Sequence, residues 1–297
     1  MMNNYPENTA DIEKKRAAIL SVFAAVFLTL IKFIVGFSTG SLGILSEALH
    51  SCLDFIAAMI TFLAVRISSK PADTTHNYGH GKVENLSALL QTILLLITCA
   101  WIIYEGLNRI ITGHTDIEVN FWSFAVVIVS IFVDYTRASH LKKIARRYNS
   151  QALEADALHF STDIFSSLVV LVGLIGALLN FHSADSIAAL IVALIVLWIS
   201  FRLGQKSIDA LLDKSPSDIE LKVRSIVESI SEVTFFHNIK VRTSGPYVFI
   251  ELNIHVDPKL SILEAHEVSE MVESKIKAQI DRCEVHTHIE PEQNMIN

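Results

Sequence analysis

The chain has 297 residues, of which 51% are hydrophobic and only 19% are charged. Soluble domains carry about 25% charged residues, so this composition favours an integral membrane protein over a soluble one. The 24 basic and 31 acidic residues give a net charge of −7, which argues against a protein that binds nucleic acid.

The first two-thirds of the chain contains six apolar segments, each close to the roughly 20 residues that a helix needs to cross a bilayer. The fourth segment is the shortest and contains Asp134, and the fifth is expected to begin early, near Ala152, with a polar first turn. The polar N-terminus has no signal-peptide pattern, so the first apolar segment is expected to stay in the membrane. The spans are predicted at residues 17–37, 43–65, 84–107, 121–138, 160–180 and 184–203.

Basic residues gather on one side of these spans. Three precede the first span at residues 14–16, and five lie within residues 137–147, at the end of the fourth span and in the loop that follows it. The turns at residues 37–43 and 180–184 contain none. Because short cytoplasmic loops are enriched in Lys and Arg, both termini of this multi-pass protein are expected in the cytoplasm, with the spans in the inner (plasma) membrane.

After about residue 205 the sequence becomes mixed and charged, as in a small soluble domain. The patterns predict helices over 219–230 and 261–280, and strands over 237–241, 247–256 and 283–289. The fold class is therefore a membrane all-α domain of six transmembrane helices followed by a small cytoplasmic α+β domain with a three-stranded sheet. The expected divisions are a cytoplasmic tail at 1–15, the membrane domain at 16–208, the α+β domain at 209–292 and a tail at 293–297.

Two pairs of polar residues interrupt the apolar segments. His50 and Asp54 are four residues apart in the second segment, and His159 and Asp163 have the same spacing in the fifth. Residues four apart lie on the same face of a helix. Ionisable residues at membrane depth are costly and usually mark an ion pathway. Two imidazoles and two carboxylates suit a tetrahedral Zn²⁺ site, so the sequence predicts a metal site carried by two membrane helices.

Other interpretations of these pairs remain open. The His and Asp side chains can also form a hydrogen-bond network between helices that needs no metal. Glu47 and Asp156 each lie three residues before a His, on nearly the same face, and are candidates for hydrogen-bond partners of the ligands or for proton relays. The alternative for both is solvation at a helix end.

Several motifs together resemble one family. They occupy residues 40–54, 76–84, 154–163, 184–191 and 249–291, in this order along the chain. The chain is similar over residues 12–292 to the cation diffusion facilitator family, in particular to its bacterial zinc/iron exporters. The resemblance implies a homodimer in which each protomer has six transmembrane helices and a metallochaperone-like cytoplasmic domain. It also implies export of a divalent cation from the cytoplasm in exchange for protons.

Carried over residue by residue, the family's transport site falls on His50, Asp54, His159 and Asp163. The bacterial zinc/iron exporters have an Asp at the position of His50, and the set found here resembles the zinc-selective members instead. Two imidazoles favour Zn²⁺ over harder cations such as Mn²⁺. Cadmium, cobalt, nickel and ferrous iron stay open as substrates.

The resemblance implies further sites outside the membrane. Asp73, His76 and His80 match a second metal site, although loop histidines are often only solvated. Lys82 and Asp213 match a salt bridge between the two domains, and two exposed charges are the alternative. Asn253 stands where the family has a His ligand, and His255, two residues along on the same strand face, is a hypothetical substitute. The matching positions of the cytoplasmic zinc cluster are His237, His266, His288 and Glu290.

Two functions of other classes are alternatives to transport. An intramembrane metalloenzyme needs an open coordination position and a general base, as in HExxH, and the chain has no such motif. All four ligand positions are filled by protein side chains, so we expect a protein that is not an enzyme. A metal-sensing scaffold that uses its spans only as an anchor would need no buried ligands.

Overall fold

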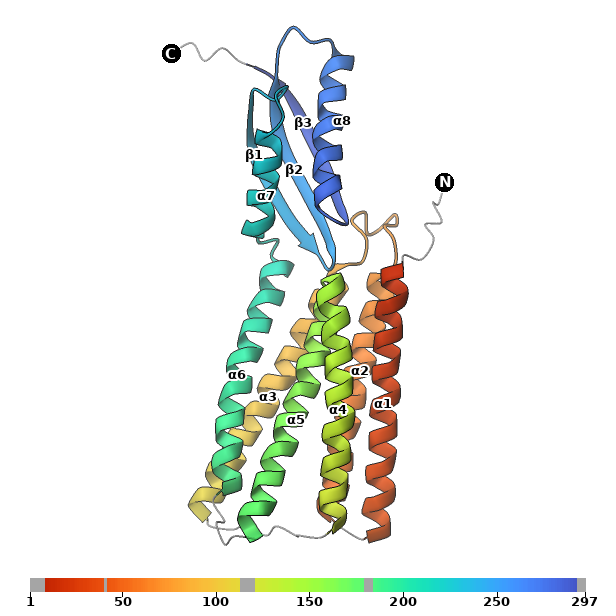
Figure 1. Cartoon of the computed structure of the whole chain (residues 1–297), viewed down its shortest axis with the longest axis vertical. Coiled ribbons are helices and arrows are strands. Elements are labelled where there is room, and N and C mark those ends of the chain that lie inside the picture. The colour runs from red at the N-terminus through yellow and green to blue at the C-terminus, as the bar shows by residue number, and fades with distance from the viewer. Residues whose placement is uncertain (1–8, 40–41, 113–120, 179–183, 293–297) are drawn as a thin grey trace. The chain divides into compact units, whose positions relative to one another are not determined.

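The computed structural model describes residues 9–39, 42–112, 121–178 and 184–292 (Figure 1). The chain divides into two units, Met1–Ile208 and Asp209–Asn297. The first unit is helical, and the second combines helices with a sheet.

In its described residues the first unit contains six long helices, and each predicted span falls on one of them. Among these described segments, five contain a stretch that is long and apolar enough to cross a membrane, namely α1, α2, α3, α4 and α6. The predicted fifth span belongs to α5 but runs past the last described residue of that helix, so it stays a prediction that α5 crosses the membrane. The helices are α1 Thr9–Thr39, α2 Leu42–Ser68, α3 Lys82–Thr112, α4 Phe121–Tyr148, α5 Gln151–Leu178 and α6 Ala184–Leu211.

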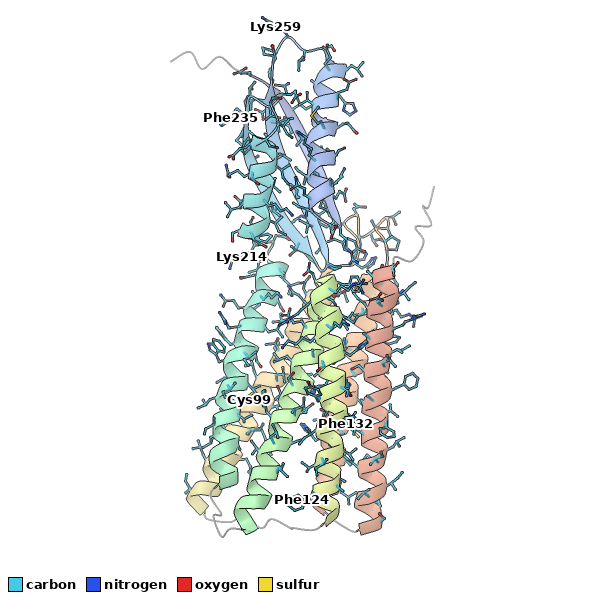
Figure 2. The ribbon with its side chains drawn as sticks, viewed as in Figure 1. Cys99, Phe124, Phe132, Lys214, Phe235 and Lys259 are labelled. Atoms are coloured by element: carbon cyan, nitrogen blue, oxygen red, sulfur yellow. The ribbon has the colours of Figure 1, made fainter. Side chains whose placement is uncertain are left out.

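Small residues line the contacts between these helices, and large apolar residues face outwards. Ala18 on α1 and Ala58 on α2 are fully buried in the core that these helices form with α4 and α5. Small side chains let helix backbones approach closely, which is how helices associate in lipid. Phe132 on α4 is 69% exposed, whereas Cys99 on α3 is buried (Figure 2). An apolar exterior of this kind is the surface that contacts acyl chains.

Helix α4 is ten residues longer than the predicted fourth span. The basic residues at 142–147, expected in a loop, lie on its last turns. No Gly or Pro interrupts residues 121–148. The helix stops only at Asn149, whose φ of 49° is a left-handed conformation that ends helices. Helix α5 begins at Gln151, which confirms the expected early start near Ala152.

One buried carboxylate connects four segments at one end of the helical unit. Glu84, at the start of α3, is fully buried. It accepts hydrogen bonds from Lys14 Nζ at 2.9 Å and Ser68 Oγ at 2.9 Å, and a further one from Ser150 Oγ. These donors come from α1, from α2 and from the connection between α4 and α5. Because a buried charge needs a partner, this cluster fixes the four segments to one another at this end.

The second unit has the predicted order helix–strand–strand–helix–strand. Its strands form one sheet in the order β1-β2-β3, with β1 and β2 antiparallel and β2 and β3 parallel. Alternate residues of β2, such as Ile250 and Leu252, are buried under the helices. The predicted α+β fold is therefore confirmed. The elements are α7 Ser217–Glu228, β1 Phe235–Ser244, β2 Tyr247–Val256, α8 Ile262–Gln279 and β3 Cys283–Pro291.

Candidate metal centre

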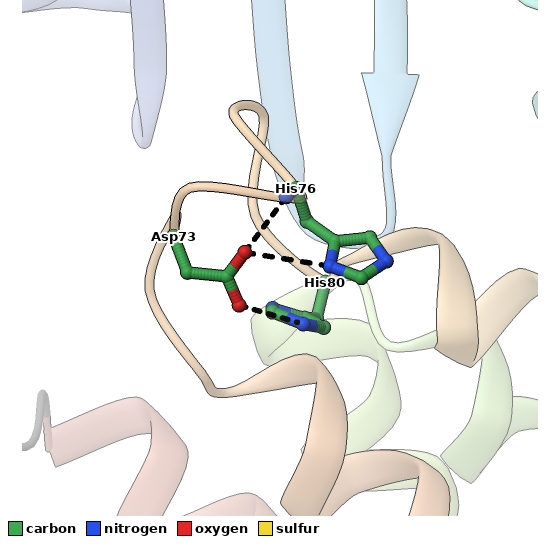
Figure 3. A group of neighbouring side chains, drawn as sticks. All are labelled: Asp73, His76 and His80. Carbon is green, nitrogen blue, oxygen red and sulfur yellow. Dashed lines mark hydrogen bonds and ion pairs between the residues drawn. The ribbon is translucent and has the colours of Figure 1, made fainter.

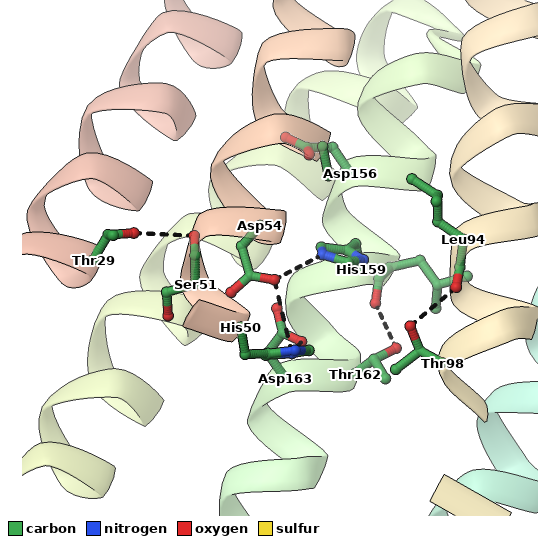
Figure 4. Close-up of polar contacts among 12 residues, drawn as sticks. Thr29, His50, Ser51, Asp54, Leu94, Thr98, Asp156, His159, Thr162 and Asp163 are labelled. Atoms are coloured by element: carbon green, nitrogen blue, oxygen red, sulfur yellow. Dashed lines mark hydrogen bonds and ion pairs between the residues drawn. The ribbon is translucent and has the colours of Figure 1, made fainter. Parts of the chain in front are cut away.

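The structure brings together the two predicted His–Asp pairs, one from α2 and one from α5 (Figure 4). His159 Nε2 lies 3.1 Å from Asp54 Oδ1, across the two helices. His50 Nε2 lies 3.8 Å from Asp163 Oδ1 and 3.9 Å from Asp54 Oδ1. His50, Asp54 and Asp163 each offer a ligand atom within 4.8 Å of the others. His159 joins this group through its contact with Asp54, so the four side chains form one connected cluster.

Burial differs among these four side chains. The side chains of Asp54 and His159 are 12% and 10% exposed, whereas the side chain of His50 is 40% exposed. Asp163 Oδ2 is buried and has no hydrogen-bond partner among the described residues. A buried carboxylate oxygen without a donor needs a cation or a proton. The Asp54–His159 hydrogen bond alone would suit a structural network, but the second oxygen of Asp163 favours a site that takes a cation.

A cavity of about 230 Å³ opens onto the four side chains. Since water occupies about 30 Å³ per molecule in the liquid, this volume suffices for a divalent cation with several of its waters. Three further charged residues, which were not predicted as part of the site, line the cavity. They are Lys32, Asp134 and Arg137. Each of these residues is a charge inside an apolar helix, and this is the sequence signal by which they could have been assigned to the site.

Two of these charged side chains donate hydrogen bonds to serine hydroxyl groups. Lys32 Nζ donates to Ser51 Oγ at 2.9 Å, and Arg137 Nε donates to Ser21 Oγ at 2.8 Å. The Arg137 guanidinium also lies 3.2 Å from the centre of the Phe160 ring. The cavity therefore contains fixed cationic groups as well as carboxylates, and these offset part of its negative charge.

The structure places one of the two candidate partner residues. Asp156, one turn before His159 on α5, is fully buried and accepts a hydrogen bond from Ser21 Oγ at 2.8 Å. The same hydroxyl accepts a hydrogen bond from Arg137, so Asp156 belongs to a polar chain beside the four candidate ligands. Solvation at a helix end does not describe it. Glu47 lies on α2, but its side chain is outside the described part of the structure.

A second group of potential ligands lies between α2 and α3 (Figure 3). Asp73 Oδ1 is 3.5 Å from His76 Nδ1, and Asp73 Oδ2 is 3.5 Å from His80 Nε2. The turn between the histidines depends on Gly79, whose φ of 74° is disfavoured for other residues. The expected loop residues are therefore brought together in a geometry that suits a metal ion.

Hydrogen bonds keep Asp73 in its charged form. Thr75 Oγ1 donates to Asp73 Oδ1 at 2.8 Å, and the backbone N–H groups of His76 and Thr75 donate to the same oxygen at 2.7 and 2.9 Å. The Thr75 hydroxyl, followed by these two N–H groups, holds the pKa of the Asp73 carboxyl well below its usual range. The loop therefore presents an ionised carboxylate beside two imidazoles over the physiological pH range.

A third group lies on the sheet of the second unit. Glu290 Oε2 on β3 is 3.4 Å from His237 Nε2 on β1 and 3.4 Å from His255 Nε2 on β2. Asn253 Nδ2 donates to Glu290 Oε1 at 2.5 Å, and this bond, with that from His237, lowers the pKa of Glu290. Asn253 therefore donates a hydrogen bond to Glu290 instead of offering a ligand atom, and His255 is the histidine of β2 that belongs to the group.

The other predicted ligands of the second unit are not part of this group. His288 Nε2 lies 3.9 Å from Glu290 Oε1, on a side chain that is 67% exposed. His266 lies on α8, where it is exposed and 3.8 Å from Glu270. Asp213 lies 4.0 Å from Arg242 within the same unit, and its expected pairing with Lys82 stays a prediction.

The first unit consists of long apolar helices around a cluster of His and Asp side chains. The second is a small αββαβ unit with further potential ligands. Together they define the class of the protein, a membrane protein that binds or transports cations. The family model "Cation efflux transmembrane domain" matches residues 18–212, and "Cation efflux protein, cytoplasmic domain" matches residues 216–292. The chain belongs to the cation diffusion facilitator, or cation efflux, family. It is a divalent cation efflux transporter of the membrane and not an enzyme, as expected from the motifs.

Relatives match along nearly the whole chain. The cation-efflux pump FieF of Escherichia fergusonii is 32% identical over 279 residues, which cover 93% of this chain and 92% of the relative. FieF of Serratia proteamaculans is 30% identical over 278 residues, which again cover 93% of this chain and 92% of the relative. Among solved structures, the metal-bound C-terminal domain of the CzcD transporter from Thermotoga maritima is 30% identical, with a TM-score of 0.25. That match covers 26% of this chain and 92% of the solved one.

Proposed function

We propose that this transporter exports Zn²⁺ from the cytoplasm in exchange for protons, and that His50, Asp54, His159 and Asp163 form its transport site. The observation that carries the proposal is the convergence of these four side chains from α2 and α5 on one cavity. The buried, unpartnered oxygen of Asp163 supports a cation in that place. The metal is the substrate of the protein.

The donor set supports zinc as that substrate. Zn²⁺ prefers four nitrogen, sulfur or carboxylate ligands in a tetrahedron, and the site offers two imidazoles and two carboxylates. Mn²⁺ prefers more oxygen ligands, so His50 works against it. Fe²⁺, Cd²⁺, Co²⁺ and Ni²⁺ accept imidazole and are the alternatives that a competition experiment separates.

Proton exchange follows from the chemistry of the ligands. His and Asp bind a metal only when deprotonated, so metal and protons compete for the same lone pairs. Zn²⁺ arriving from the cytoplasm displaces protons from the site, and a lower pH on the far side favours protonation and release. Movement of α2 and α5 relative to neighbouring helices would expose the site to each side in turn. His50, the most exposed of the four side chains, is the group through which the ion enters.

The other two groups suit regulation better than transport. Asp73, His76 and His80 are on a loop, and His237, His255 and Glu290 are on the sheet of the second unit, which we expect in the cytoplasm. We propose that cytoplasmic zinc binds there and draws together the second units of a homodimer, because bound cations reduce carboxylate repulsion. His266 and His288 are the remaining predicted ligands of the second unit, and both are exposed and available to a site shared with such a partner.

Reconstituted vesicles test the transport site. We expect pH-driven Zn²⁺ uptake to be lost in Asp54→Ala and in Asp163→Ala, whereas Cys52→Ala on another face of α2 keeps it. A zinc site of four ligands is stabilised by about 10–16 kcal/mol, so one ligand contributes about 2.5–4 kcal/mol. Each Asp variant should therefore bind zinc at least about 70-fold more weakly. Undiminished flux in both variants would exclude this assignment.

A further inference from the structure

A second cavity, of about 320 Å³, opens between α4, α5 and α6, away from the proposed transport site. Its charged lining comes from α4 and α6, which contribute Lys142, Arg146, Arg202 and Lys206, and from Glu154 on α5. All four cationic side chains are exposed at the surface of the helical unit. The cavity is therefore a groove with a strongly basic rim.

Among the described residues, one of these four cations is paired with a carboxylate. Lys206 Nζ lies 2.6 Å from Glu154 Oε2. Within the described part of the chain, Lys142, Arg146 and Arg202 have no ion pair with a carboxylate, and Arg202 instead lies 4.7 Å from the ring centre of Trp198. Three positive charges without a carboxylate partner in the described residues therefore surround one opening, an arrangement that suits an anionic group.

The rest of the groove is apolar and continues onto the outer surface of α6. Leu158 and Ile199 are among the lining residues. Next to them on α6, Ile195 is 48% exposed and Trp198 is 60% exposed. Trp side chains are enriched at the level of lipid headgroups, where the ring contacts both apolar and polar surroundings. The groove therefore has a basic end and an apolar end, in the arrangement of a phospholipid.

We propose that this groove binds an anionic phospholipid, with its phosphate at Lys142, Arg146 and Arg202 and its acyl chains along the exposed face of α6. The basic end belongs to the side of the membrane that we expect to be cytoplasmic, where anionic lipids are enriched. Basic pockets between transmembrane helices on that side are typical headgroup sites. The proposal depends on the membrane location of the helices and is independent of the metal.

The general preference for basic residues at cytoplasmic helix ends does not by itself explain this groove. Lys143 and Arg147, the sequence neighbours of two rim residues, satisfy the same preference on another face of α4. Neither lines the groove. Arg147 is engaged by Glu13 at 3.2 Å. These two residues give a control that removes the same charge from the same helix.

Native mass spectrometry of the full-length protein, titrated with phosphatidylglycerol or with phosphatidylcholine of the same acyl chains, tests the proposal. Each basic residue near an anionic headgroup contributes about a fivefold gain in affinity. We expect Lys142→Gln/Arg146→Gln to weaken phosphatidylglycerol binding about 25-fold. The Lys143→Gln/Arg147→Gln control should change it less than about twofold, and the charge-keeping Lys142→Arg/Arg146→Lys should retain it.

Three outcomes would overturn the proposal: equal retention of the two lipids by the wild type, unchanged binding in the rim variant, or an equal loss in rim and control variants. Inorganic phosphate at millimolar concentration is added in a parallel titration. Complete displacement of the lipid by phosphate would show a site for a free anion and would also overturn it. If the double rim variant does not elute as folded protein, Arg202→Gln replaces it, with an expected loss of about fivefold.

Discussion

Substitution of His50 by Asp tests why this transporter should prefer zinc. The imidazole lies 3.8 Å from Asp163 and 3.9 Å from Asp54. An Asp side chain is shorter, so its carboxylate would lie about 6 Å from the two existing carboxylates. At an effective dielectric constant of about 20, each like-charge pair at about 6 Å is unfavourable by about 3 kcal/mol. Two such pairs give about 6 kcal/mol of repulsion in the empty site.

A bound divalent cation relieves this repulsion whatever its chemical type, whereas the lost nitrogen donor affects zinc most. We therefore expect His50→Asp to bind Mn²⁺ and Fe²⁺ more tightly than the wild type does. Its preference for Zn²⁺ over Mn²⁺ should fall by about tenfold.

The assay is competition flux in reconstituted vesicles at equal total metal, with Zn²⁺ opposed in turn by Mn²⁺, Fe²⁺, Cd²⁺ and Co²⁺. Isothermal titration of the purified protein gives the corresponding affinities. His50→Gln serves as a control, because it removes the imidazole without adding a charge. An unchanged ratio of Zn²⁺ to Mn²⁺ flux in His50→Asp would refute the reasoning about this donor.

Three other changes probe neighbouring features. Asp134→Asn should lower flux about tenfold but change zinc affinity less than about threefold, because Asp134 lines the cavity without joining the four donors. A loss of zinc affinity as large as that of Asp54→Ala would contradict this prediction. Lys14→Met leaves the buried Glu84 carboxylate without its cation and should destabilise the helical unit by about 3–5 kcal/mol, seen as a lower thermal midpoint. The Ser261 backbone N–H, with its hydroxyl, lowers the pKa of Glu264, so Ser261→Ala should raise that pKa in an NMR titration. Because a depressed carboxyl pKa stabilises the fold above the ordinary Glu pKa of about 4.3 and less so as pH falls, the wild type should lose more stability on acidification than the variant.

The ligand pairs could be predicted because local spacing alone defines them. His50 and Asp54, and likewise His159 and Asp163, are one helical turn apart in segments with few other polar residues. Lys32, Asp134 and Arg137 carry the same signal of a charge in an apolar helix, yet their convergence on the cavity depends on how α1 and α4 pack. In a membrane helix both faces are apolar, so periodicity does not indicate which face a single charge occupies.

The boundaries of elements were less predictable, for physical reasons that the structure makes plain. The basic run at 142–147 has the composition of a loop, but helix propensity continues until Asn149 adopts its left-handed conformation. Strand β1 runs over Phe235–Ser244 and so extends beyond the predicted 237–241 on both sides, because its pairing with β2 continues past the residues that alternate. An irregularity in this pairing between His237 and Lys240 also interrupts the alternation from which a strand is recognised.

The buried Glu84 cluster has a mechanical consequence for alternating access. It holds α1, α2, α3 and the α4–α5 connection together at one end, so these helices can tilt about that end more easily than they can slide. Asp54 is 14 residues from Ser68 on α2, which is about 21 Å along the helix axis. A tilt of about 10° about this pivot would displace Asp54 by about 4 Å. That displacement is as large as the contacts that assemble the site, so a small rotation of a well-anchored bundle suffices to dismantle it.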